Sequence, residues 1–346
     1  MKLFHDFGNV DVRNERITQQ SDLEKLLKIE DEILALHPSS TKRYSAFQCN
    51  ILYTTILKKT EELLQGINLT NNLLQEYISN RENHGENDDA VVRGMYSGAL
   101  LQILSKNKEE VIQIIGSEKK FDYLFYYVKE TKNVIVKNVI GNNLFCHAGS
   151  YGGKISHIYV TNIKGINTLG FIGNEKGRAE HIVAVDITGS FSFCELGSLG
   201  YAKNITAINC RGDFSFFRAG RIGEIHNLTI SNAKGNNILS TMADTQGKCS
   251  GLIASQIEGN DTLEMAGTQK GTIENVTLAE IEGKDLLVAA NIKGYRMHKR
   301  LPSRKQDILD EIERSVKEMF DKNAQYQMSE SLKIAQLQEE LFVEET

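Results

Sequence analysis

Residues 178–189 read RAEHIVAVDITG, and residues 201–212 repeat the same pattern as YAKNITAINCRG. In both segments apolar residues alternate with others and the segment closes on a glycine. The closing glycine recurs at intervals of 24, 24, 23, 23, 24 and 24 residues, at Gly141, Gly165, Gly189, Gly212, Gly235, Gly259 and Gly283. A fixed period of this length indicates a solenoid, in which each unit buries its apolar face against its neighbours.

Five further positions are apolar in register with these glycines. Around Gly189 they are occupied by Ile182, Ala184, Ile187, Phe193 and Leu196. Residues two apart on a strand point to the same side, so the first two positions are predicted to face inward together. The step of three to the next position breaks this alternation and predicts a bend. A second glycine follows each first one by 11 or 12 residues, which leaves room for short strands but not for a helix.

This pattern resembles the right-handed parallel β-helix class over about residues 131–295. The coil of about 24 residues favours that class over the shorter left-handed hexapeptide type. The resemblance is architectural and carries over no functional residues. We therefore expect a mainly β solenoid of about seven coils with helical caps.

Three regions are predicted: an N-terminal helical region and solenoid lid over 1–130, the β-helix over 131–295, and a basic linker with a helical tail over 296–346. Helical patterns cover about 21–37, 41–65, 71–80, 90–106, 109–115, 303–320 and 329–342. Phe47 and Ile51 are predicted on the buried side of the second helix. An open solenoid end exposes core and unpaired strand edges. We expect residues 121–128 to cover the first coil and the first tail helix to cover the last.

Composition narrows the function classes. The 40 basic and 45 acidic residues give a net charge of −5, which does not favour nucleic acid. The N-terminus lacks the apolar core of a signal peptide, and no apolar run approaches the ~20 residues of a membrane span. Five cysteines, an odd number without paired spacing, fit a reducing compartment. We expect a cytoplasmic protein with no cofactor.

Two polar columns accompany the repeat. One lies three residues before each glycine, at Asn138, Asn162, Asp186, Asn209, Asn232, Gln256 and Glu280. The other lies eight residues before, at Asn133, His157, His181, Asn204, Asn227, Gly251 and Asn275. Stacked asparagines hydrogen-bond along the axis and tolerate turn conformations, so both columns are interpreted as structural ladders.

His157 and His181 are the exception in the second column. Two stacked imidazoles could share a metal, although the column offers no third ligand of the usual kind. They are weak candidates for a metal site, and the expectation is that none is present.

A third column, six residues after each glycine, should face outward, and it contains His147, Glu195 and Arg218. A base, a carboxylate and an anion clamp on one exterior sheet would suit a polysaccharide lyase or glycoside hydrolase. Against this, two coils separate His147 from Glu195.

Exposed apolar residues give a different signal. Phe171, Phe217 and Met265 near this column, with Tyr159 and Tyr201 elsewhere, could form a patch for a partner. The basic residues Arg296, Lys299 and Arg300 after the last coil could bind a phosphate or a lipid headgroup.

The sequence as a whole favours a non-catalytic scaffold that binds another macromolecule, with a protein as the first choice of partner, along one flank. A glycan is a second choice, and self-association through a solenoid end or the tail helices is a third. A glutamate-rich end, residues 339–346, loosely resembles a type IV secretion signal and suggests a bacterial effector as one variant. The alternative is the polysaccharide lyase or glycoside hydrolase.

Overall fold

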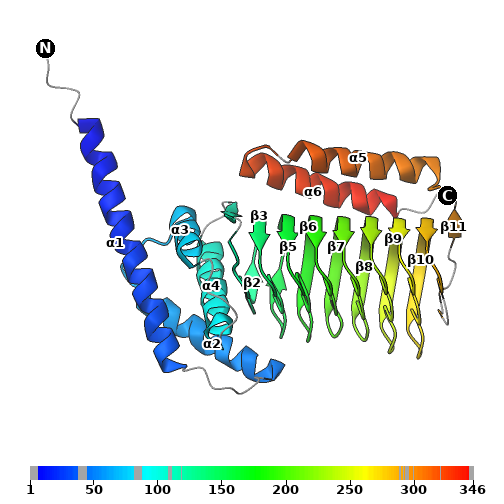
Figure 1. Ribbon diagram of the computed structural model, residues 1–346, viewed down its shortest axis with the longest axis horizontal. Helices are drawn as coiled ribbons and strands as arrows, with labels where there is room; N and C mark the ends of the chain where they lie inside the picture. The colour runs from blue at the N-terminus through cyan, green and yellow to red at the C-terminus, as the bar shows by residue number, and fades with distance from the viewer. Residues whose placement is uncertain are drawn as a thin grey trace, which may run out of the picture.

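The computed structural model describes residues 7–37, 45–81, 88–107, 111–117, 119–287, 290, 292, 296–298, 300–319 and 321–342. A group of N-terminal helices stands at one end of a row of stacked strands, and two C-terminal helices lie along that row (Figure 1). The helices are α1 (Phe7–Leu36), α2 (Ala46–Leu63), α3 (Asn71–Arg81), α4 (Asp88–Asn107), α5 (Ser303–Met319) and α6 (Ala324–Leu341). No helix in these described ranges combines the length and apolar character that crossing a membrane requires.

The stacked strands form one parallel, 11-stranded sheet. They are β1 (Ile112–Ile115), β2 (Glu130–Thr131), β3 (Val134–Ile140), β4 (Lys154–Ile155), β5 (Ile158–Lys164), β6 (Arg178–Thr188), β7 (Tyr201–Arg211), β8 (Glu224–Lys234), β9 (Lys248–Glu258), β10 (Thr272–Glu282) and β11 (Arg296–His298). Neighbouring coils pair in the register of the sequence repeat, as Ile182 with Ile205 and Ile205 with Leu228. The predicted parallel β-solenoid is confirmed.

The predicted inward columns form the core of the solenoid. Ile182, Ala184, Ile187, Phe193 and Leu196 are all completely buried. The corresponding side chains of the other coils are buried too, except in the last coil, where Ile281, Leu287 and Ala290 remain partly exposed. Each coil therefore fills its interior only together with its neighbours.

The predicted bends are left-handed backbone positions. All residues of the column three before each glycine have φ between 51° and 57°. Asn162 Nδ2 donates to Asn138 Oδ1 over 2.8 Å, and Asn209 Nδ2 donates to Asp186 Oδ1 over 2.9 Å. Asparagine and aspartate are the non-glycine residues that adopt this conformation most readily. The ladder thus fixes the bend and satisfies its own polar groups.

The repeat glycines are required by backbone proximity. A Cβ on Gly165 would lie 1.8 Å from the carbonyl oxygen of Gly141, and one on Gly177 would lie 1.8 Å from that of Gly149. No side chain fits at such a distance, so both glycine columns mark corners where successive coils touch through their backbones.

The segment 121–128, expected to cover the first coil, is instead part of a coil itself. Tyr123 N donates to Asn142 O, and Phe145 N donates to Leu124 O. The sheet also begins earlier than residue 131, because β1 pairs with β3 in the place where 109–115 was expected to be helical. This coil escaped the sequence pattern because β1 and Lys120 pair with residues 22 and 20 positions later rather than 23 or 24.

Helices α3 and α4 close this first coil with polar side chains. Gln102 Oε1 accepts from Lys129 N and Glu130 N, and Ser97 Oγ accepts from Phe125 N. On α3, Gln75 binds both the N–H and the C=O of Ile115. These side chains take the place of a neighbouring strand, so the edge of the sheet is not left unpaired.

On α2, which begins with a capping box at Ser45, the prediction of the buried side is wrong for Phe47 and Ile51. They are 63% and 52% exposed, whereas Cys49, Tyr53 and Ile56 are buried. The buried face of α2 instead contains Tyr53, whose hydroxyl donates to the buried Gln102.

The C-terminal helices do not cover the last coil as expected. Strand β11 continues the sheet by pairing with β10, and α5 and α6 then run as a hairpin along the flank of the solenoid (Figure 1). Beneath the hairpin lie outward-facing apolar side chains of the sheet, including Ile135, Tyr159 and Val183. Tyr159, expected in an exposed patch, is therefore completely buried.

One glutamine fixes the position of the hairpin. Gln338 of α6 is fully buried, and its Nε2 donates to Ile205 O over 2.8 Å. Its Oε1 accepts from Thr206 Oγ1 over 3.0 Å. Next to it, Glu339 accepts from Lys203 Nζ and Asn204 Nδ2. These contacts bind α6 to β7 and give Glu339, part of the acidic end, a structural role.

Candidate functional site

The side of the solenoid that comes after each repeat glycine is built of turns. We call it the turn flank and define it by residues 142–149, 166–173, 190–197, 213–220, 236–243 and 260–267. Every second residue here is left-handed, as at Phe191, Phe193 and Glu195. The N–H of Phe193 bonds to Thr168 O of the preceding coil, and the N–H of Glu195 bonds to Phe217 O of the following one. The backbone is thereby satisfied, and side chains two and six residues after each glycine point outward.

His147 lies in an aromatic stack on the turn flank. Its ring centroid is 4.6 Å from that of Tyr127 and 4.5 Å from that of Phe171, with nearly parallel planes. Its Nδ1 is buried without a hydrogen-bond partner. Burial lowers the pKa of His147 to about 4, so the ring is neutral at physiological pH. His147 is therefore packed between two aromatic rings, as a structural residue would be.

Glu195 and Arg218 form a pair two coils further on. Their closest side-chain oxygen and nitrogen are 3.8 Å apart, and the guanidinium lies 4.9 Å from the ring centroid of Phe217. Burial raises the pKa of Glu195, and Arg218 opposes that effect. The coil that carries Phe171 separates His147 from Glu195. The structure therefore brings together two members of the predicted catalytic trio and not the third.

An apolar patch, defined by Ile166, Phe191, Phe214 and Phe217, lies on the turn flank next to this pair. The rings of Phe191 and Phe214 are stacked at 5.0 Å, and Phe217 meets Phe214 edge-on at 5.6 Å. Ile166 is 52% exposed and Phe191 is 38% exposed. Three consecutive coils contribute to this surface.

The patch interrupts two polar ladders. The positions equivalent to Phe191 and Phe214 are occupied in the other coils by Asn143, Asn167, Asn237, Asp261 and Asp285. All of these residues, including the two phenylalanines, have positive φ. Ile166 stands in the neighbouring column, where Asn142, Asp213, Asn236 and Asn260 each accept the N–H of the next coil. Asparagine and aspartate adopt the left-handed conformation more readily than phenylalanine does, and Phe191 in addition places an apolar ring at the surface.

The remaining predicted binding residues are scattered. Met265 is 39% exposed on the turn flank, two coils beyond Arg218. Tyr201 is half-buried on the outer side of β7. Arg296 belongs to the last strand and Arg300 is exposed after it, while Lys299 lies outside the described residues.

His157 and His181 are stacked as predicted, with ring centroids 4.6 Å apart. Burial, with His181 as a second cause, lowers the pKa of His157 to about 4. His181 Nδ1 lies 3.3 Å from Asn204 Nδ2, which joins the histidines to the asparagine ladder. Within the described part of the chain, no group of three or more His, Cys, Asp or Glu side chains could hold a metal ion.

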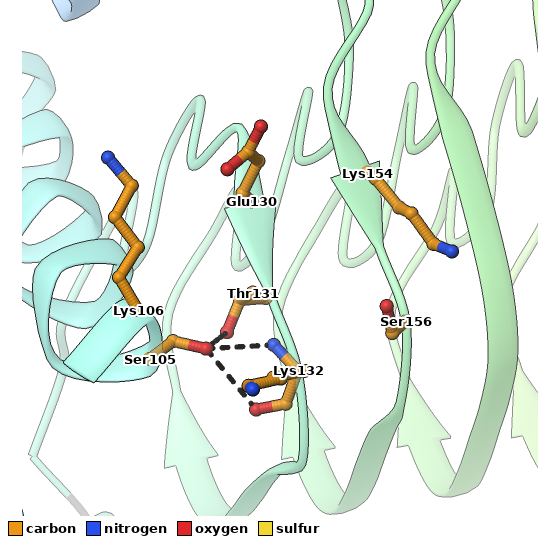
Figure 2. Close-up of a pocket in the computed structure, with 7 residues that line it drawn as sticks. All are labelled: Ser105, Lys106, Glu130, Thr131, Lys132, Lys154 and Ser156. Atoms are coloured by element: carbon orange, nitrogen blue, oxygen red, sulfur yellow. Dashed lines mark hydrogen bonds between the residues drawn. The ribbon is translucent and has the colours of Figure 1, made fainter. Parts of the chain in front are cut away.

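A cavity of about 250 Å³ lies where α4 meets the first coils. Figure 2 shows its lining residues: Ser105, Lys106, Glu130, Thr131, Lys132, Lys154 and Ser156. The amino groups of Lys106 and Lys154 point to opposite sides (Figure 2), because they pair with Glu61 and Glu180 outside the lining. Ser105 Oγ accepts from Lys132 N and Thr131 Oγ1. The cavity lies where the helical cap contacts the solenoid. Its lysine amino groups do not converge on one point, so they do not form an anion site.

Comparison of the chain with protein-family models, curated proteins and solved structures gives no match. Function therefore has to be argued from the surface itself. Of the four residues of the apolar patch, the sequence pattern predicted Phe217 as a binding residue but not Ile166, Phe191 or Phe214. The available signal was an apolar residue in a column that is otherwise Asn, Asp, Ser or Lys.

Proposed function

We propose that the protein is a binding scaffold whose turn flank holds a protein partner through the apolar patch. The observation that carries this proposal is the stacking of the exposed Phe191 on the half-buried Phe214, both at left-handed positions that other coils fill with Asn or Asp. A residue that is unfavourable for folding and solubility at its position is best explained by a contact that it makes.

The surroundings of the patch also suit a protein interface. Such interfaces combine a small apolar centre, rich in aromatic residues, with a polar rim. The patch provides the centre, and Glu195 and Arg218 provide a charged rim on one side. Arginine and large aromatic residues are the types that most often dominate binding energy. The hydrogen-bonded turns of the turn flank would present these groups without a large loss of conformational entropy.

The alternative of a polysaccharide lyase or glycoside hydrolase has less support, since His147 is stacked between rings and lies two coils away from Glu195. Delivery to a host cell as an effector remains a prediction, and residues 343–346 of the acidic end lie outside the described structure.

A photo-crosslinking experiment tests the scaffold proposal. A photoreactive phenylalanine analogue is placed at Phe191, or at Leu199 as a matched control with the same 38% exposure outside the patch. In cells that express the protein, we expect a discrete cross-linked protein with the analogue at 191, and its loss when Phe214 is also changed to Asn. Equal cross-linking from both positions, or none from 191, would contradict the proposal.

A further inference from the structure

A serine, a histidine and a carboxylate are hydrogen-bonded in series on the outer face of β8 and β9. Ser250 Oγ lies 2.5 Å from His226 Nδ1, and His226 Nε2 lies 3.2 Å from Glu224 Oε2. Ser250 and His226 are half-buried, and Glu224 is exposed. None of these residues belongs to the turn flank, so a role for them is independent of the proposed scaffold function.

The sheet holds this series rigidly. His226 pairs in register with Ser250, and Glu224 pairs with Lys248 on the same two strands. The intervening side chains, Ile225 and Cys249, are completely buried and anchor both strands in the core. Alternation along a strand then places all four polar side chains on the outside.

The series is particular to this pair of coils. In the column that contains His226 and Ser250, the other coils carry Lys132, Ser156, Glu180, Lys203 and Glu274. Ser156 is therefore a serine at the equivalent position, with Lys132 rather than a histidine at this position of the preceding coil. The repeat itself does not demand a serine next to a histidine.

We propose that Ser250 is an activated nucleophile that hydrolyses carboxylic esters, with His226 as general base and Glu224 as the residue that positions His226. A hydroxyl bonded to an imidazole that is itself held by a carboxylate is the arrangement that activates serine in hydrolases. Here the roles of the two ring nitrogens are exchanged: Nδ1 accepts from the serine, and the Nε2 hydrogen is donated to Glu224.

The reaction balances with water as the only co-reactant. Ser250 Oγ attacks the ester carbonyl carbon while its proton passes to His226 Nδ1. The tetrahedral intermediate collapses, the C–O bond to the alcohol breaks, and the proton on Nδ1 passes to the departing alkoxide. Water then attacks the acyl-serine through the same base, releasing the carboxylic acid and restoring Ser250.

Neighbouring side chains indicate the kind of ester. Lys248 lies two residues before Ser250 on the same exposed face and offers a cation to the developing oxyanion. The ring of Tyr201 is 5.3 Å from that of His226, with the Arg178 guanidinium 5.0 Å from the Tyr201 centroid. An aromatic leaving group can pack against this ring. The class of substrate is thus an aryl ester with a good leaving group, since one exposed lysine is a weaker stabiliser than a closed oxyanion hole.

The test uses the full chain with a fluorophosphonate probe, which labels activated serines, and with p-nitrophenyl acetate as substrate. We expect one label per chain, located on Ser250 by peptide mass spectrometry, and turnover of the ester. Ser250→Ala should abolish both, and His226→Gln, which keeps a polar side chain but removes the base, should slow labelling about 100-fold or more. Ser156→Ala is the matched control and should label like the parent.

Glu224 is tested by rescue. Glu224→Gln should slow labelling, whereas Glu224→Asp, which keeps the carboxylate, should label at most of the parent rate. If Glu224 were only structural, the carboxylate would not be needed for the labelling rate. Thermal unfolding of each variant establishes that it is folded. An unlabelled Ser250, or labelling that survives His226→Gln in a folded protein, would overturn the proposal.

Discussion

The ring of Phe342, just after α6, occupies the space that a side chain on Gly251 would fill. A Cβ on Gly251 would lie 2.8 Å from Phe342 Cδ1 and 3.0 Å from Cε1. Gly251 is the only glycine in a described column otherwise made of Asn and His, including Asn227 in the preceding coil. The end of the tail is therefore fitted to the solenoid at this coil, in addition to the contacts that α6 makes with β7.

Gly251→Asn introduces the residue that the column would otherwise carry. We expect the ladder to accept the asparagine and Phe342 to be displaced, so that the end of α6 loosens. Hydrogen exchange should rise in α6 and stay unchanged in the inward positions of β9. The double variant Gly251→Asn/Phe342→Ala should show no further loosening beyond Phe342→Ala alone. Unchanged exchange in α6 of the single variant would mean that the fit has no energetic role.

Gln102→Leu tests the closure of the first coil by α4. The leucine has similar volume but leaves the amides of Lys129 and Glu130 and the hydroxyl of Tyr53 without their acceptor. Buried donors without partners cost about 1–3 kcal/mol. We expect a loss of that order in urea unfolding, with faster exchange at Lys129 and Glu130. A leucine variant as stable as the parent would show that water serves these groups equally well.

Ile182→Asp places a charge in the core of the solenoid, where Ile182 is completely buried. An uncompensated buried charge costs about 3–5 kcal/mol, and coils stabilise one another, so we expect the whole solenoid to unfold together. Circular dichroism during heating measures this. Ile182→Val is the control and should lose about 1 kcal/mol. An aspartate variant that melts like the parent would contradict the inward assignment of this column.

Acid should weaken the fold through His147 and His157. Burial lowers the pKa of each to about 4 in the folded protein, whereas an unfolded histidine has a pKa of about 6.5. Between these two values the unfolded chain binds more protons than the folded protein does. The contribution of these histidines to the free energy of unfolding therefore has its full value above about pH 6.5 and falls progressively toward pH 4. His157→Asn, the residue common in its column, should reduce the difference in urea midpoint between pH 7 and pH 5. An equal difference in parent and variant would place the acid sensitivity elsewhere.

The solenoid could be predicted from the sequence because its rules are local and repeated. Gly165 and Gly189 mark the corners, Ile182 and Ala184 mark the interior, and Asn162 marks the bend. The tail could not be placed in this way. Its position depends on Gln338 meeting Thr206 and on Phe342 meeting Gly251, contacts between residues more than 90 positions apart that obey no period. The first coil was missed for a related reason, because its spacing departs from that of the others.

In the candidate sites, too, the features that follow the repeat could be predicted and the others could not. Columns predicted which side chains face outward, including those of Phe171, Glu195 and Met265. They did not predict that His147 would be enclosed between Tyr127 and Phe171, since the first of these rings belongs to the missed coil. Ser250 and His226 are 24 residues apart, so their proximity was within reach of the repeat, but the pairing with Glu224 depends on side-chain geometry.

The most direct test of the scaffold claim is to restore the ladder that the patch interrupts. In the double variant Phe191→Asn/Phe214→Asn, both left-handed positions receive the residue found in neighbouring coils. We predict that the thermal midpoint is unchanged or raised, while the partner identified by cross-linking at 191 is no longer retained. Leu199→Asn, made in parallel, should retain it. A double variant that melts no lower than the parent and still retains the partner would contradict the claim that these phenylalanines are there to bind.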